Sequence, residues 1–134
     1  MRVVLDTNVL LSGLFVRGIC EALLDACVGS DDYVLVLSEH ILGEFQQHAS
    51  EKFHAPARDV RKTIKFLRSH AELVEPAKVP KKACRDKDDL PVLGTLVAGQ
   101  ADCLVTGDKD LLTLKSFQNI PIVSPREFYN HLQG

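Results

Sequence analysis

Features that define several other protein classes are missing from this chain of 134 residues. No C-x-x-C pair occurs among its four cysteines, which argues against a zinc knuckle or a redox motif and favours small core residues in a reducing compartment. No apolar run is long enough for a transmembrane helix, and Met1 leads directly into a strand-like segment that is too short for a signal peptide. We therefore expect a cytoplasmic protein.

An excess of positive charge is also missing. The net charge of −2 excludes a globally basic nucleic-acid binder, although it is compatible with a local basic patch. There is no aromatic-rich motif of the kind that reads RNA bases, and no internal repeat. What is present is a composition of 46% hydrophobic and 25% charged residues, typical of a globular domain that can bury a core without disulfides.

The apolar pattern alternates between short strand-like runs and longer helical ones. It predicts strands over residues 2–5, 33–37, 73–74, 103–105 and 120–123, and helices over residues 9–14, 19–28, 39–51, 57–70, 90–99 and 125–132. Residues 78–88 form a polar, basic loop. The alternation predicts an α/β fold with a central parallel sheet and helices on both faces, and such sheets carry their sites at the carboxyl ends of the strands.

Two aspartates follow directly after predicted strands. Asp6 comes after residues 2–5, and Asp108 follows Thr106 and Gly107 at the end of residues 103–105. The structural alternatives are a helix cap for Asp6 and an ordinary Gly-Asp turn for Asp108. Adjacent parallel strands would bring both carboxylates to one edge of the sheet, which favours a shared site.

Two further carboxylates lie toward the inner faces of predicted helices. Glu44 borders the apolar stripe that contains Ile41 and Phe45, although a glutamate whose stem packs on the edge of the core would look the same. Asp89 precedes apolar residues at helical spacing and stands at the N-terminal end of its helix, where the helix dipole favours an anion. Asp88 is a candidate cap for that helix, and Asp86 reads as loop surface.

Four carboxylates at one sheet edge would repel one another unless cations lie between them. A set of oxygen ligands without His or Cys selects hard ions such as Mg²⁺ or Mn²⁺. Ions of this kind suit in-line phosphodiester hydrolysis, in which they orient the attacking water and stabilise the leaving oxygen. The residues therefore predict a metal-dependent hydrolase.

The order and spacing of these motifs resemble the PIN domain, most closely the stand-alone PIN proteins of toxin–antitoxin pairs. The motifs are Val-Val-Leu-Asp6-Thr-Asn8, Ser38-x5-Glu44, Asp89-x-x-Val-Leu and Leu-Val-Thr106-Gly-Asp108-Lys-Asp110. The resemblance covers nearly the whole chain and implies a single PIN-like nuclease domain over residues 1–134, with a three-layer α/β/α fold. It also implies an endoribonuclease that is often dimeric and has an antitoxin protein as a partner. One departure is Leu93-Gly94-Thr95, where the family usually carries alanines.

By position, the resemblance assigns the catalytic and metal-binding roles to the four carboxylates already singled out, Asp6, Glu44, Asp89 and Asp108. The neighbouring polar residues of the motifs, Asn8, Thr106 and Asp110, are expected to support them. Asp86, Asp88 and Asp110 crowd the same motifs, so the assignments of Asp89 and Asp108 are less sharply defined than that of Asp6.

Basic residues are concentrated in the loop that leads into Asp89. Of these, Lys81, Lys82, Arg85 and Lys87 are candidates for binding an RNA backbone, and a solvated loop is the alternative. His40, Glu44 and His48 share one helix at a spacing of four residues, but without an H-E-x-x-H motif the histidines fit the surface of a helix better than a transition-metal site.

Two other functions are compatible with the pattern. One is a non-catalytic module of the same fold that binds RNA or protein, which the presence of all four carboxylates disfavours. The other is a phosphohydrolase for small esters, which the absence of an Asp-x-Asp-x-Thr motif after the first strand disfavours.

Overall fold

A computed structural model of the protein describes residues 1–16 and 18–134. The strands are β1 (Arg2–Leu5), β2 (Val34–Leu37), β3 (Ala71–Leu73), β4 (Cys103–Val105), β5 (Ser116–Phe117) and β6 (Ile120–Val123). The helices are α1 (Thr7–Phe15), α2 (Ile19–Gly29), α3 (Glu39–Lys52), α4 (Ala57–His70), α5 (Leu90–Ala98), α6 (Lys109–Leu114) and α7 (Pro125–Gln133), with the short 3-10 helix η1 (Lys87–Asp89) before α5.

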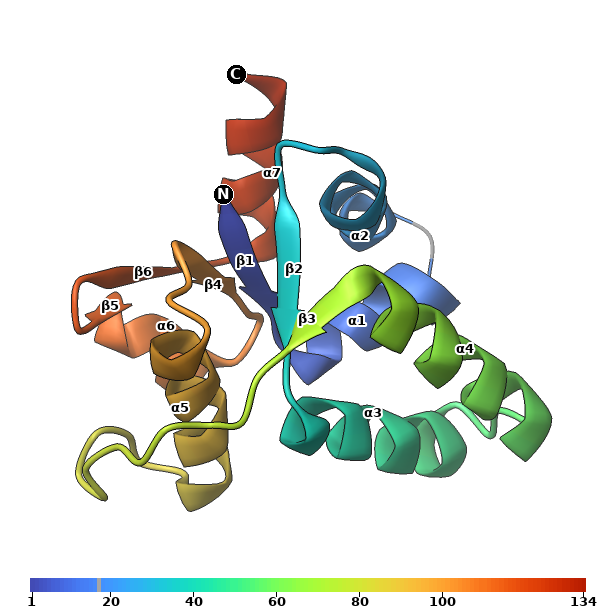
Figure 1. Ribbon diagram of the computed structural model, residues 1–134, viewed down its shortest axis with the longest axis horizontal. Coiled ribbons are helices and arrows are strands. Elements are labelled where there is room, and N and C mark those ends of the chain that lie inside the picture. The colour runs from blue at the N-terminus through green and yellow to red at the C-terminus, as the bar shows by residue number, and fades with distance from the viewer. Residues whose placement is uncertain (17) are drawn as a thin grey trace.

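The strands form one six-stranded sheet in the order β3-β2-β1-β4-β6-β5. Every pairing is parallel except that of the short edge strand β5 with β6. Helices lie on both faces of the sheet, and the two termini lie near one another at the end opposite the carboxyl end of β1 (Figure 1). This arrangement confirms the predicted α/β/α fold with a central parallel sheet.

The central strands are buried because, apart from Arg2 at the start of β1, they are apolar. In β1 the side chains of Val3, Val4 and Leu5 have no exposed surface, and Leu104 and Val105 of β4 are equally buried beside them. A strand of a parallel sheet covered by helices has no face that contacts water, so a continuous apolar run is stable where an alternating one would not be.

Local hydrogen bonds define the starts of helices α3 and α7. The hydroxyl of Ser38 accepts a hydrogen bond from the backbone N–H of Ile41, 3.4 Å away, at the start of α3. Ser124 and Glu127 form a reciprocal capping box at the start of α7, with Pro125 in the first turn. Since α3 begins directly after β2, its first turns lie at the carboxyl edge of the sheet.

Some local expectations differ from the structure. Residues 109–114 form helix α6, which was not predicted because six residues are too few to show helical periodicity. The carboxylate of Asp108 caps this helix, so the turn considered as the alternative for Asp108 is the start of a helix. Asp88 caps no helix among the described residues. Asp86 instead caps η1, where its carboxylate accepts a hydrogen bond from the N–H of Asp88 at 2.9 Å. Asp89 therefore lies in η1, just before α5, rather than on the helix itself.

Gly94 is explained by a close approach between α5 and the segment after β3. The backbone N–H of Ala77 donates to the carbonyl oxygen of Gly94 at 3.0 Å, and a Cβ atom at Gly94 would lie 2.3 Å from the carbonyl oxygen of Ala77. Next to it, the hydroxyl of Thr95 donates to Ser38 at 2.9 Å. The Gly-Thr pair thus lets the chain cross α5 closely and ties α5 to the start of α3.

Candidate metal centre

The four predicted carboxylates line one pocket at the carboxyl end of the sheet. The pocket has a volume of about 320 Å³, and its wall includes Asp6, Glu44, Asp89 and Asp108. Asp6 follows β1, Glu44 comes from α3, Asp89 from η1, and Asp108 stands at the start of α6. The fold therefore brings together side chains that are up to 102 residues apart in the sequence.

Asp6 is the most deeply placed of the four, with 6% of its surface exposed. Its backbone N–H continues the sheet by donating to Val105, while its carboxylate accepts hydrogen bonds from the N–H of Thr7 at 2.8 Å and from the hydroxyl of Thr106 at 2.7 Å. Burial raises the pKa of Asp6, the two hydrogen bonds oppose that rise, and the nearby carboxylate of Asp108 adds to it. Asp6 also caps α1, so the cap and a site residue share one position.

A chain of hydrogen bonds links Asp6 to the turn that carries Asp108. The hydroxyl of Thr106, which donates to Asp6, also accepts from the N–H of Asp108 at 3.0 Å. Asn8 supports the same turn by accepting a hydrogen bond from the N–H of Gly107 at 3.2 Å. Thr106 and Asn8 thus hold the two aspartates in register, whereas Asp110 does not line the pocket and contributes its N–H to the carboxylate of Asp108.

Glu44 is held from its own helix and faces the turn of η1. The Nε2 atom of His40, one turn earlier, lies 3.1 Å from a carboxylate oxygen of Glu44 and 3.1 Å from the carbonyl oxygen of Asp88. His40 therefore connects α3 with η1. Burial raises the pKa of Glu44, and His40 acts in the opposite direction. These contacts give His40 a positioning role that the spacing of the histidines alone did not indicate.

Asp89 has a carboxylate oxygen that is available to bind a ligand. Its Oδ2 atom is buried and has no hydrogen-bond partner in the described part of the chain. Burial, followed by the charges of Asp108, Asp86, Asp6 and Glu44, raises its pKa to about 7. A buried acceptor that lacks a donor is destabilising, and a cation would satisfy it.

The chemistry of this donor set fits a hard divalent cation. All four principal donors are carboxylates, the orphaned oxygen of Asp89 lies in their midst, and like-charge repulsion between them would fall when a cation binds. Within residues 1–16 and 18–134, however, no three His, Cys, Asp or Glu side chains already stand close enough to form a set of ligands. Small side-chain movements would be needed to close the carboxylates around an ion.

Sequence reasoning missed Lys52, His48, Thr7, Asp86 and Asp88 as residues that line this pocket. A signal was available for two of them, because His40, Glu44, His48 and Lys52 recur every four residues and so form one stripe along α3. The predicted basic residues Lys81, Lys82, Arg85 and Lys87 are exposed and do not line the pocket. Lys87 nevertheless stands between Asp86 and Asp88, which do.

Comparison with known proteins agrees with this fold. The sequence matches a family model described as the PIN domain over residues 2–110. Among solved structures, the fold is similar to VapBC2 from Rickettsia felis bound to a DNA fragment from their promoter, with a TM-score of 0.64, 15% sequence identity, and coverage of 92% of this chain and 98% of that one. No curated protein matches the sequence. In the described part of the chain, no helix is both long and apolar enough to cross a membrane.

Proposed function

The chain belongs to the PIN domain family, and we propose that it is an endoribonuclease that uses Mg²⁺ or Mn²⁺ and acts in the cytoplasm. PIN domains are generally nucleases that use divalent metal ions. The observation that carries the proposal is one pocket lined by four carboxylates, of which Asp89 has a buried oxygen without a hydrogen-bond partner in the described part of the chain. Residues 1–134 would form this nuclease domain, and the four free thiols support a reducing compartment.

In this proposal the four carboxylates hold the cation, and the other residues position them. When bound, the cation supplies activation of water and neutralisation of charge on the phosphate. Thr106 keeps the carboxylate of Asp6 in place, Asn8 fixes the turn of Asp108, and His40 orients Glu44. Lys52, on the wall of the same pocket, would attract a phosphate that the carboxylates alone would repel.

A covalent mechanism through a nearby thiol is disfavoured by the state of Cys84. Its Sγ atom donates to the carbonyl oxygen of Asp86, 3.1 Å away. Burial, with the carboxylates of Asp89 and Asp86 next in effect, raises the pKa of this thiol. A protonated thiol is a poor nucleophile, so the chemistry of the pocket favours hydrolysis by water.

The proposal predicts that Mg²⁺ or Mn²⁺ stabilises the folded protein. An ion at a hundred times its dissociation constant stabilises the folded state by about 2.7 kcal/mol, which for a chain of this size raises the melting temperature by roughly 5–10 °C. Melting curves in a metal titration measure the shift, and cleavage of a mixed RNA substrate is followed in the same buffers.

Two matched variants make this test specific. Glu44→Gln removes one proposed ligand and should abolish most of the shift, whereas Asp102→Asn changes an exposed aspartate that accepts a hydrogen bond from Arg2 at the other end of β1 and should keep it. A stable protein with no shift at millimolar metal, and no RNA cleavage, would instead favour a non-catalytic module that binds RNA or protein.

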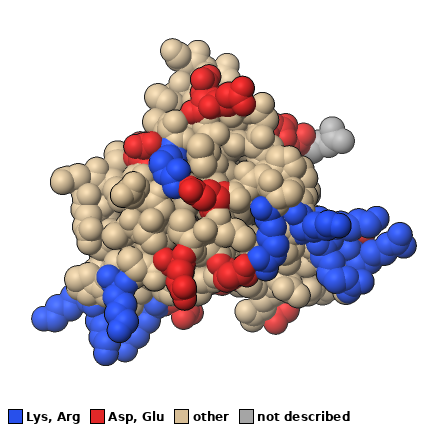
Figure 2. Space-filling view, viewed as in Figure 1, with Lys and Arg blue, Asp and Glu red and all other residues tan. Residues whose placement is uncertain are grey.

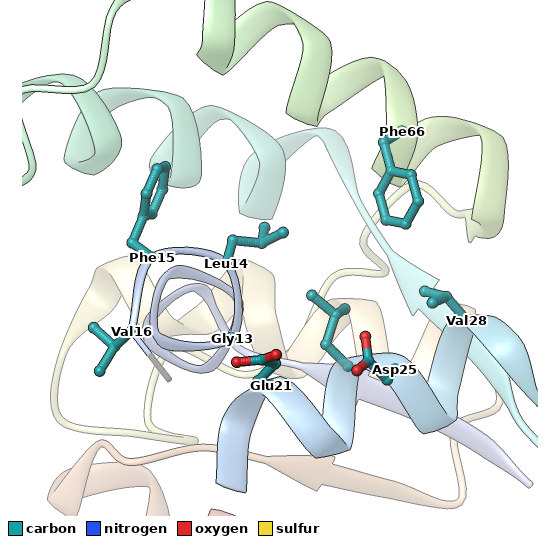
Figure 3. A pocket seen from close by; sticks show the side chains of 9 residues that line it. Gly13, Leu14, Phe15, Val16, Glu21, Asp25, Val28 and Phe66 are labelled. Atoms are coloured by element: carbon teal, nitrogen blue, oxygen red, sulfur yellow. The ribbon is translucent and has the colours of Figure 1, made fainter. Parts of the chain in front are cut away.

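We further propose that the chain is the toxin of a toxin–antitoxin pair and that the antitoxin docks in a second hollow. This groove, of about 380 Å³, lies between the end of α1, helix α2 and Phe66 of α4 (Figure 3). Phe15, Val16 and Phe66 are large apolar side chains exposed at its edge, and Glu21 and Asp25 of α2 add negative charge. An amphipathic helix with an apolar face and flanking cations would complement both features. The likeness to VapBC2 supports this proposal.

Phe66→Asp should weaken binding of the protein encoded by the adjacent gene by at least about thirtyfold, because a charge replaces a large apolar contact of the groove. Leu73→Asp, at an exposed apolar residue of β3 outside the groove, should leave the affinity within twofold of the native value. Calorimetry with the purified partner measures both. Equal binding by the two variants would show that the groove is not the docking site. A homodimer that Phe66→Asp dissociates would assign the groove to a second copy of the chain.

A further inference from the structure

Helix α4 carries a concentrated positive charge in a chain whose net charge is negative. Its basic residues are Arg58, Arg61, Lys62, Lys65 and Arg68, and its one acidic residue is Asp59. All five basic side chains are exposed, and the helix buries only Val60 and Leu67. The spacing of the basic residues places them along one side of the helix, away from the core.

Most of this charge is not neutralised within the protein. Arg68 forms an ion pair with Glu39 at the start of α3. The other four basic side chains of α4 form no ion pair with any residue among 1–16 and 18–134. Four like charges within about two turns of helix repel one another, so an anionic ligand along this side would be favourable.

The basic side of α4 is connected to the carboxylate pocket through Lys52. Lys52 lines the pocket from the last turn of α3, and only four residues separate it from the start of α4. The two helices pack against each other, and the backbone N–H of Ala55 folds the connection back by donating to Ala49. Positive charge therefore continues from the wall of the pocket onto α4 along one short stretch of chain.

A second basic group lies in the loop that leads into Asp89 of the pocket. It comprises the exposed side chains of Lys81, Lys82, Arg85 and Lys87, of which Lys87 stands between two residues that line the pocket. In Figure 2 basic side chains gather at two separate places, over α4 and over the loop before α5, with acidic side chains between them. On this face, a polyanion that contacts both groups crosses the acidic side chains between them.

We infer that the backbone of a single-stranded RNA runs from the loop before α5, across the carboxylate pocket and past Lys52, onto the basic side of α4. This inference rests on the proposed function and adds the path of the substrate. Because the pocket itself repels phosphate, anchors on both sides are needed to hold the scissile bond there. The ring of Phe53 is exposed next to Lys52 in the sequence and stacks on the ring of Phe15, with 5.2 Å between the ring centroids. An unpaired base could stack on this aromatic surface, which favours a single-stranded RNA.

The test compares two pairs of substitutions that remove the same charge. Arg61→Gln with Lys65→Gln neutralises the middle of α4, whereas Lys115→Gln with Arg126→Gln neutralises two cations outside α4 and the pocket. Binding of a fluorescent single-stranded RNA is measured over a range of salt concentrations, with chelator present so that the RNA stays intact. Melting temperatures verify that both variants fold.

Each lost phosphate contact lowers the slope of log K against log salt by about 0.7, so the α4 variant should lose about 1.4 and bind roughly 25-fold more weakly at 0.1 M salt. The control pair should keep the native slope. If the native protein cuts RNA with Mn²⁺ but the α4 variant keeps its slope, the path is wrong and the proposed function stands. If the native protein neither binds nor cuts RNA, both the path and the proposed function are wrong.

A duplex of the same sequence that binds equally well overturns the single-strand assignment. An acidic protein partner that binds α4 in place of RNA overturns the path.

Discussion

Asp6→Asn is expected to lower the rate of RNA cleavage by about a hundredfold to ten-thousandfold. Asparagine keeps the size of the side chain at the end of β1 but removes the negative charge that a cation needs there. Asp6 is the most buried of the four carboxylates, and Thr7 and Thr106 fix its orientation.

The stability of the metal-free variant should change little, which separates lost chemistry from lost folding. Both carboxylate oxygens of Asp6 accept a hydrogen bond, one from the N–H of Thr7 and one from the hydroxyl of Thr106. Asparagine has only one side-chain oxygen, so its NH₂ group must face one of these two donors, which is unfavourable. Removing the charge also relieves repulsion from Asp108, and the two effects oppose each other. Asp102→Asn is the matched control and should cleave RNA at the native rate. An Asp6→Asn protein that cleaves like the native one would show that Asp6 does not hold a catalytic ion.

The elements that could be predicted from the sequence are apolar runs with clear limits and helices with a clear apolar repeat. The strands of residues 103–105 and 120–123 have the predicted limits because polar or turn-forming residues follow them, and the helix of residues 57–70 has them because its apolar residues repeat at helical spacing. The carboxyl ends of parallel strands then predicted that Asp6 and Asp108 lie close together, and both line one pocket. Helix α6 was missed because six residues contain too little periodicity to separate a helix from a turn.

Contacts that depend on how two elements pack could not be predicted. The bridge from His40 to both Glu44 and Asp88 requires the relative position of α3 and η1, which no local pattern encodes. The same applies to the orphaned oxygen of Asp89, since burial of one carboxylate oxygen is a property of the assembled pocket. Lys52 could have been identified from the four-residue spacing on α3 that it shares with Glu44 and His48. This surface of α3 becomes a pocket wall only when η1 folds against it.

Asp89→Asn is expected to make the metal-free protein more stable, and increasingly so as the pH rises. The native pKa of Asp89 is about 7, against an ordinary value of 3.8. Below 3.8 the carboxyl group is protonated in both the folded and the unfolded state, and it contributes no difference. Between 3.8 and about 7 the folded state holds a proton that the unfolded state has lost, so the native protein loses stability as the pH rises. Above about 7 that loss is complete.

The asparagine does not titrate, so the difference in stability between the variant and the native protein should increase between pH 3.8 and about 7. The side chain is partly exposed, and with that allowance we expect a gain of about 1–2 kcal/mol at pH 8, or roughly 3–6 °C in melting temperature, measured in chelator. In Mn²⁺ the order should reverse, because the native protein gains an ion that the variant binds weakly. Asp102→Asn, whose amide oxygen can still accept the hydrogen bond from the N–H of Arg2, should gain nothing. If Asp89→Asn instead melts well below the native protein in chelator at pH 8, Asp89 supports the fold rather than a cation, and the pocket is not a metal centre built on this residue.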